Sequence, residues 1–348
     1  MPNKLDSIII FITSIIACIF FIKIENFLGI DYKYHPDALH YLKYKIDIAH
    51  EIYLSTESVA SFLKSYFGRF FYFWVDILNY NPSYIIFSNI IFFAITNVII
   101  FNIFNKKLIN FDYLSLLLLI AVLFMPYRLH LSAHVLKETM MIFFFSLCFL
   151  RIHYLYKILP IIFIFYLRKF SLIYFLIFFN LNKIFNYFQI NIILKLIILL
   201  FLLIVGLDII NELFIFHYES NLIEQVTAWS QKNMGGRDYD NITNFKYYHA
   251  YGVLLKAFIW PILFLSGSFV FFSFNFYFLI LAVEIIVINI LFYKKYKKLL
   301  ISAEIYIVLF FISFHVSTFT AYFRYSYIAF ILIIFYKLYY LENEKKNK

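Results

Sequence analysis

The sequence predicts an all-α, polytopic integral membrane protein with about eight to ten transmembrane helices. Between Lys256 and Glu284 the chain runs for 27 residues without a charged side chain, and similar apolar stretches recur along its length. Hydrophobic residues make up 64% of the 348 positions and charged residues only 14%, far from the averages of soluble domains. Lipid offers no hydrogen bonds, so such a chain satisfies its backbone within helices.

Eight stretches are apolar enough to be predicted as spans. They are 7–24, 83–104, 111–126, 139–157, 190–207, 268–292, 299–319 and 325–341. A further apolar pair, 159–167 and 170–181, is divided by Arg168 and Lys169, and each half is too short to cross alone. The pair is interpreted as a re-entrant hairpin or as two short tilted helices, which gives eight or ten crossings.

Lysine placement predicts that both termini are cytoplasmic. Lysines at 106–107, 183, 294–298 and 345–348 fall on one side if the spans alternate, and positive charge marks the inside. The net charge of +10 therefore reflects topology and does not indicate nucleic-acid binding. Lys4 precedes an apolar run with no small-residue cleavage site, so the first helix is expected to stay uncleaved.

Two long connections are expected on the outside of a single transmembrane domain that covers 1–348. They are 25–82 and 208–252. Apolar residues recur at helical spacing in 37–53 and again in 62–78, which predicts helices lying on the membrane surface. Cys18 and Cys148 both sit in apolar stretches and are interpreted as core residues.

Five of the six arginines fall at the outer face or in the outer half of the membrane on this topology. They are Arg69, Arg128, Arg168, Arg237 and Arg324. The planar guanidinium binds phosphate oxygens in pairs, and charge at membrane depth is usually retained for a purpose. The set therefore indicates a binding site for an anion such as a lipid-linked diphosphate. The alternative is that each arginine pairs with an acid or a lipid headgroup.

The densest polar cluster joins two predicted spans at 126–138. It contains Arg128, His130, His134, Lys137 and Glu138. The last four would share one face if the segment were helical. The two histidines have zinc-like spacing, but no third ligand is evident from the sequence, so no metal is predicted. The alternative is a polar connection with a helix start at Lys137 and Glu138.

Two further segments carry candidate chemistry. Asp37, in the first outward connection, could act as a general base, or Pro36 and Asp37 could simply begin a helix. Arg324 and Tyr325 precede the last span. Glu284 and Glu304 lie inside spans, where they would pair with Lys195 or the 294–298 cluster, or mark an ion pathway in a transporter.

This layout resembles the bacterial O-antigen and capsular repeat-unit polymerases, and more broadly the GT-C class of membrane glycosyltransferases. The shared features are an acid in the first outward loop, a Ser-x4-Lys-Glu element opening an apolar helix, an Arg in a short apolar pair, a large second loop and an Arg-Tyr before the final span. Here these are Asp37, Ser132 with Lys137 and Glu138, Arg168, the loop before Trp260 and Pro261, and Arg324 with Tyr325. The first loop lacks the paired acids of the metal-dependent members.

The resemblance implies polymerisation of undecaprenyl-diphosphate-linked oligosaccharides at the periplasmic face of a bacterial inner membrane, with no cofactor. Catalytic roles fall to Asp37 and Glu138, diphosphate binding to Arg128, Lys137, Arg168 and Arg324, and substrate binding to His35, His130, His134, Arg237 and Tyr325. Expected partners are the lipid-linked substrate, membrane lipid and a chain-length regulator. The alternatives are a flippase or other transporter of the lipid-linked oligosaccharide, and a single-sugar transferase of the same class.

Overall fold

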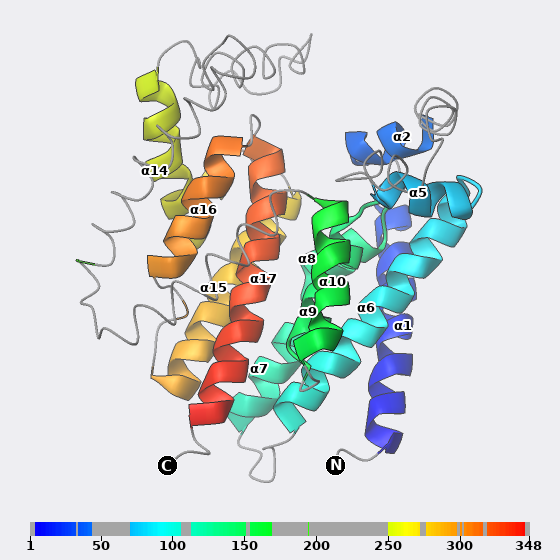
Figure 1. The fold of residues 1–348 in the computed structure, drawn as a ribbon, viewed down its shortest axis with the longest axis horizontal. Coiled ribbons are helices and arrows are strands. Elements are labelled where there is room, and N and C mark those ends of the chain that lie inside the picture. The colour runs from blue at the N-terminus through cyan, green and yellow to red at the C-terminus, as the bar shows by residue number, and fades with distance from the viewer. Residues whose placement is uncertain are drawn as a thin grey trace. The chain divides into compact units, whose positions relative to one another are not determined.

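Every element described by the computed structural model is a helix (Figure 1). The description covers residues 4–32, 34–43, 70–105, 113–150, 154–168, 194, 250–271, 276–297, 300, 303–315 and 319–344. Four segments within these ranges are long and apolar enough to cross a membrane: Lys4–Phe27, Pro82–Ile103, Tyr113–Ser132 and Phe276–Tyr296. The expected all-α membrane protein is confirmed at this level. The number of crossings and the orientation stay predictions.

The chain divides into two compact units. The first unit comprises 1–173, 287–300 and 331–348, and the second unit comprises 174–286 and 301–330. The site described below lies entirely in the first unit. The prediction of a single transmembrane domain is not tested by this division.

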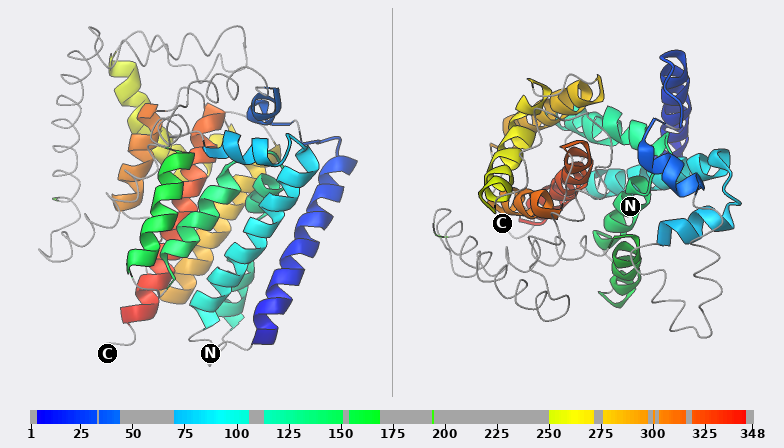
Figure 2. Two further views of the ribbon diagram at one scale, coloured as in Figure 1. Left: turned by 45° about the vertical axis from the view of Figure 1, so that its right-hand side comes forward. Right: turned by 90° about the horizontal axis from the view of Figure 1, so that it is seen from above.

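Two long antiparallel helices form the frame of the first unit. These are α1 (Lys4–Phe27) and α6 (Pro82–Asn105), which lie side by side in Figures 1 and 2. Ser7 Oγ donates to Asn102 Oδ1 at 3.4 Å, and Asn97 Nδ2 donates to Ser14 Oγ at 3.0 Å. Both helices match their predicted spans closely, because each is a long run without charge in its middle.

The next predicted span, 111–126, contains one helix and ends at a proline, as expected. Helix α7 (Tyr113–Leu123) ends before Pro126, which begins the short helix α8 (Pro126–Ser132). Residues 133–137 are not helical, and α9 (Glu138–Cys148) starts after them. Asn89 of α6 donates to the backbone carbonyls of His134 and Leu136 at 2.9 and 3.0 Å. Irregular backbone inside a membrane protein needs such internal partners.

Helix α10 (Tyr154–Leu167) corrects the predicted boundaries downstream. The expected span 139–157 is wrong as one continuous helix, because α9 ends at Cys148 and residues 149 and 150 are not helical. The sequence places Arg151 and His153 between α9 and α10, which makes that interval unfavourable in lipid. Phe144 and Phe163 stack at 4.7 Å between ring centroids and hold α9 against α10.

Two short helices lie in the first long connection. Helix α2 (Pro36–Lys43) and helix α5 (Phe70–Ile77) fall at the start of the predicted segment 37–53 and near the end of 62–78. The Tyr41 ring packs against Phe71 and Tyr72 at 4.8 and 5.1 Å. The remainder of this connection lies outside the described residues.

The second unit is built from α14 (Ala250–Ser266), the 3-10 turn η2 (Ser268–Phe271), the first part of α15 (Phe276–Tyr296), α16 (Ala303–His315) and the first part of α17 (Phe319–Glu344). Helix α14 was not predicted, because the predicted span 268–292 begins after it. Gly267 has a φ of +71°, a left-handed conformation that suits glycine, and it divides the uncharged stretch. The segments 190–207 and 208–249 lie outside the description, apart from residue 194.

Candidate functional site

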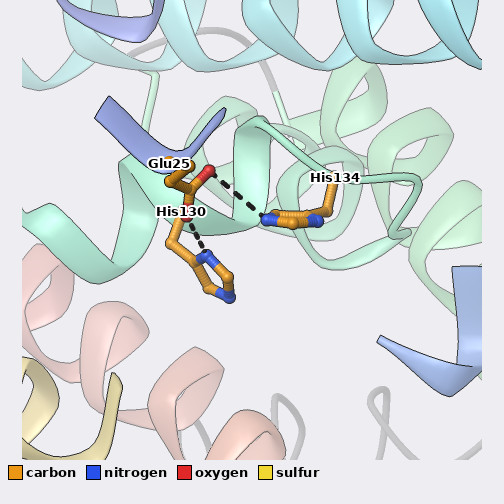
Figure 3. Close-up of side chains that lie close together, drawn as sticks. All are labelled: Glu25, His130 and His134. Carbon is orange, nitrogen blue, oxygen red and sulfur yellow. Dashed lines mark hydrogen bonds and ion pairs between the residues drawn. The ribbon is translucent and has the colours of Figure 1, made fainter. Parts of the chain in front are cut away.

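A carboxylate and two histidines meet inside the first unit (Figure 3). Glu25 comes from the last turn of α1, His130 from α8, and His134 from the non-helical segment after α8. They are 4%, 0% and 1% exposed. Burial of this kind is rare for ionisable side chains unless they are paired or functional.

The contacts form a short chain of polar atoms. Glu25 Oε1 lies 2.6 Å from His130 Nδ1, and Glu25 Oε2 lies 3.4 Å from His134 Nε2. On its other side, His130 Nε2 lies 2.7 Å from His35 Nε2. A neutral His130 that donates from Nδ1–H to Glu25 can accept at Nε2 from His35, so one arrangement of protons satisfies both short contacts.

The end of α1 brings His35 back over this cluster. Gly29 has a φ of +75° and the Ile30 amide donates to the Glu25 carbonyl at 2.8 Å, so the helix closes with a glycine C-cap. The reversed chain places the Tyr34 ring 6.0 Å from His130 and 6.2 Å from His134. Tyr34 is 40% exposed, so the buried cluster reaches the surface through the segment that follows α1.

Arg128 lies in the same short helix as His130 but serves a different group. Two residues along a helix turn the side chain by about 200°, so the two point to opposite faces. The Arg128 guanidinium donates to the Val122 carbonyl at 2.9 Å and to Asn97 Oδ1 at 2.8 Å, and it lies 4.7 Å from the centre of the Phe93 ring. These contacts close the gap between α7 and α8. Its predicted contact with a diphosphate stays a prediction.

The predicted common helical face of His130, His134, Lys137 and Glu138 is wrong. Helix α8 ends at Ser132 and α9 starts at Glu138, because Asn89 holds the intervening backbone open. The two histidines still converge. Lys137 Nζ donates to the Leu167 carbonyl at 3.4 Å, which places it beside the backbone that leads into Arg168. Glu138 is 1% exposed in the first turn of α9.

The other predicted site residues are spread more widely. Asp37 occupies the first turn of α2, as the helix-start alternative expects. Arg324, in the second unit, is 7% exposed and lies 5.3 Å from the centre of the Tyr325 ring. Arg237 lies outside the described residues. The structure therefore brings together His35, His130 and His134 among the predicted residues, and it places Lys137 near Arg168.

Glu284 has a partner that the sequence hypotheses did not include. The Tyr327 hydroxyl donates to Glu284 Oε1 at 2.5 Å inside the second unit. Lys195, which the sequence suggested as the partner, lies outside the described residues. A hydroxyl from α17 thus meets part of the hydrogen-bonding need of this buried carboxylate.

Glu25 is the functional candidate that sequence reasoning missed. Position 25 was predicted to lie in the first outward connection, 25–82, yet α1 continues to Phe27 and Glu25 belongs to that helix. An acid at the end of a long apolar helix is unfavourable unless something nearby uses it. That signal was present in the sequence, but the histidines that contact Glu25 are more than a hundred positions away.

Comparison with known proteins finds no family model, no curated protein and no solved structure that matches this chain. The geometry of the cluster is therefore what indicates its function.

Proposed function

We propose that this protein is a membrane glycosyltransferase that polymerises oligosaccharide repeat units carried on a polyprenyl diphosphate. The observation that carries the proposal is the chain from Glu25 through His130 to His35. It is a carboxylate–imidazole unit buried among apolar helices, at the point where α1 gives way to the first long connection. Transfer of a sugar from a lipid carrier needs a proton acceptor at such a boundary.

The roles of the residues follow from the contacts. Glu25 holds His130 in the tautomer with a proton on Nδ1, which leaves Nε2 as the basic atom. An acceptor hydroxyl that takes the place of His35 at Nε2 would pass its proton to the ring while its oxygen attacks the anomeric carbon. The bond from that carbon to the diphosphate oxygen breaks, and the carboxylate of Glu25 stabilises the imidazolium that forms.

The leaving diphosphate needs cations. Lys137 contacts the backbone carbonyl that precedes Arg168, so these two positively charged residues are the best-supported diphosphate ligands of the predicted set. Arg324 lies in the second unit, and its predicted contact with a diphosphate stays a prediction. Arg128 is assigned a structural role because its guanidinium is occupied by Val122 and Asn97.

The proposal includes a cellular setting. The lipid carrier is undecaprenyl diphosphate, the membrane is the inner membrane of a bacterium, and the reaction occurs at its periplasmic face. A chain-length regulator is the expected protein partner. The apolar helices around the cluster support this setting by offering a polyprenyl tail a route from the bilayer.

Complementation tests the proposal. A bacterium deleted for this gene is supplied with the wild-type protein, Glu25→Gln or His130→Gln, and its surface glycan is separated by length. We expect single repeats with both variants and long chains with the wild type. Long chains with either variant at normal protein levels would overturn the assignment. Build-up of lipid-linked repeats on the cytoplasmic leaflet would indicate a flippase instead.

A further inference from the structure

Three imidazole rings lie close together, and two of them, His130 and His134, contact the Glu25 carboxylate. The ring centroids are 4.4 Å apart for His130 and His134, 4.9 Å for His35 and His130, and 5.2 Å for His35 and His134. Rings that share one tetrahedral ion, with metal–nitrogen bonds of about 2.0–2.1 Å, have their centroids about 5 Å apart. The His130 and His134 rings, which both face Glu25, are therefore close enough to share one ion.

His134 supplies a second observation. It is 1% exposed, and among the described residues neither of its ring nitrogens has a hydrogen-bond partner. A buried imidazole without a partner is unfavourable by a few kcal/mol. Its Nε2 lies 3.4 Å from Glu25 Oε2, too far for a good hydrogen bond. Two ligand atoms on a tetrahedral zinc ion are about 3.4 Å apart.

We propose that Glu25, His130 and His134 bind a transition-metal ion, with Zn2+ the best match. One oxygen of Glu25 and one nitrogen from each of His130 and His134 lie within 4.8 Å of one another. Imidazole ligands select zinc and its neighbours over magnesium and calcium, which prefer oxygen alone.

Metal binding requires only local rearrangement. The short contact of His130 Nδ1 with Glu25 Oε1, at 2.6 Å, is bridged by a proton that an incoming ion would displace. The ligand atoms then separate by some tenths of an ångström. His35, which contacts His130 at Nε2, would orient that ring without binding the ion, which leaves three protein ligands. Three protein ligands and one open position are typical of catalytic zinc.

The sequence missed this site because its third ligand is distant. His130 and His134 are four residues apart, but Glu25 precedes His130 by 105 positions. The inference goes beyond the proposed polymerase, and metal binding can be measured on the resting protein. In a polymerase, the bound ion would take the place of the Glu25–His130 base: it would bind a sugar hydroxyl and favour its negatively charged form.

The test is metal content. The full-length protein is purified in detergent with a tag free of histidine, stripped with a chelator, incubated with Zn2+ and desalted. We expect about one zinc per wild-type chain by mass spectrometry, and at least a tenfold lower content in Glu25→Gln and His134→Ala. His40→Ala is the matched control, because His40 lies on α2, five positions after His35. It should keep the wild-type content.

A second measurement covers variants that fail to fold. Wild-type protein loaded with Co2+ is expected to show the strong visible bands of a tetrahedral ion, which Zn2+ should abolish. Absence of zinc from the wild type, weak octahedral cobalt bands, or equal zinc in folded Glu25→Gln and His134→Ala would overturn the metal site. If Glu25→Gln loses polymer but the wild-type protein binds no zinc, only the metal site is overturned. If the wild-type protein binds zinc but Glu25→Gln makes normal polymer, only the polymerase is overturned.

Discussion

Two groups of buried polar side chains lie in the first unit, one around Arg128 and one around Glu25, and their partners differ in kind. Arg128 donates to a backbone carbonyl and to Asn97, and Asn97 in turn donates to Ser14 and to the Leu123 carbonyl. Every contact in that group ties one helix to another. The Glu25 group instead contains His134, whose ring nitrogens lack hydrogen bonds in the described structure.

From this difference we infer that the Arg128 group is structural and that the Glu25 group is the candidate site, although both are equally buried. Arg128 is 2% exposed and His130 is 0% exposed, so burial alone does not distinguish them. What distinguishes them is whether the protein itself satisfies the polar atoms. A satisfied network stabilises the fold, whereas an incompletely satisfied one with titratable groups is suited to protons, metals or substrates.

The largest expected effect is on the reaction rate of Glu25→Gln. The neutral amide cannot stabilise a protonated His130, so the turnover of lipid-linked repeats should fall by about 10²–10⁴-fold. The measurement is the initial rate with purified protein in detergent. Asp6→Asn, the same chemical change at the other end of α1, is the control and should retain the wild-type rate. Equal rates for the two variants would remove Glu25 from catalysis.

Arg128→Met should affect stability before it affects rate. The change leaves Asn97 Oδ1 and the Val122 carbonyl without their donor, which should lower the free energy of unfolding by about 2–5 kcal/mol. Titration with a denaturing detergent measures this change. Arg128→Lys keeps the charge but not the two-pronged geometry and should recover only part of the loss. A fully stable but inactive Arg128→Met would show instead that Arg128 serves the substrate.

The arginine result shows the limit of reading function from sequence. A charged residue within an apolar sequence indicates that its burial is unfavourable and must be offset by another interaction. The sequence does not reveal whether a ligand or the protein offsets it. For Arg128 the structure shows acceptors from the protein, the Val122 carbonyl and Asn97. Asn97 lies on another helix, and no pattern in the sequence distinguishes it. The Glu25–His130 contact likewise depends on how helices pack.

The helices themselves follow a similar rule. Helices α1 and α6 were predicted to within a few residues, because their long uncharged runs have no other stable structure in lipid. Breaks inside uniformly apolar sequence were harder to predict. Gly267 divides α14 from η2 without any change in composition around it, and its left-handed backbone is visible only in three dimensions. Pro126 gave a clear local signal, and α8 begins there.

A smaller effect is expected where the two groups share a support. Asn89 donates to the carbonyls of His134 and Leu136, so Asn89→Ala should let the segment 133–137 move. We expect stability to fall by about 1–3 kcal/mol and zinc affinity by about 10–100-fold, as for other residues that orient metal ligands. Competition with a fluorescent chelator measures the affinity. An unchanged affinity in a destabilised variant would show that Asn89 supports the fold alone.

The smallest expected effect isolates a single contact in the structural group. Ser14 accepts a hydrogen bond from Asn97 and donates to the Ile10 carbonyl. In Ser14→Ala, Asn97 keeps its bonds to Leu123 and Arg128, so the loss should be near the average of about 0.6 kcal/mol for hydrogen bonds between membrane helices.

Thr13→Ala is a close control, because Thr13 is the preceding residue and its hydroxyl donates within α1, to the carbonyls of Ile9 and Ile10. Unfolding in detergent should show a loss for Ser14→Ala and almost none for Thr13→Ala. If the two variants were equally stable, the Ser14–Asn97 contact would add nothing to the packing of α1 against α6. The structural group would then reduce to Arg128, Asn97 and the backbone carbonyls around the break between α7 and α8.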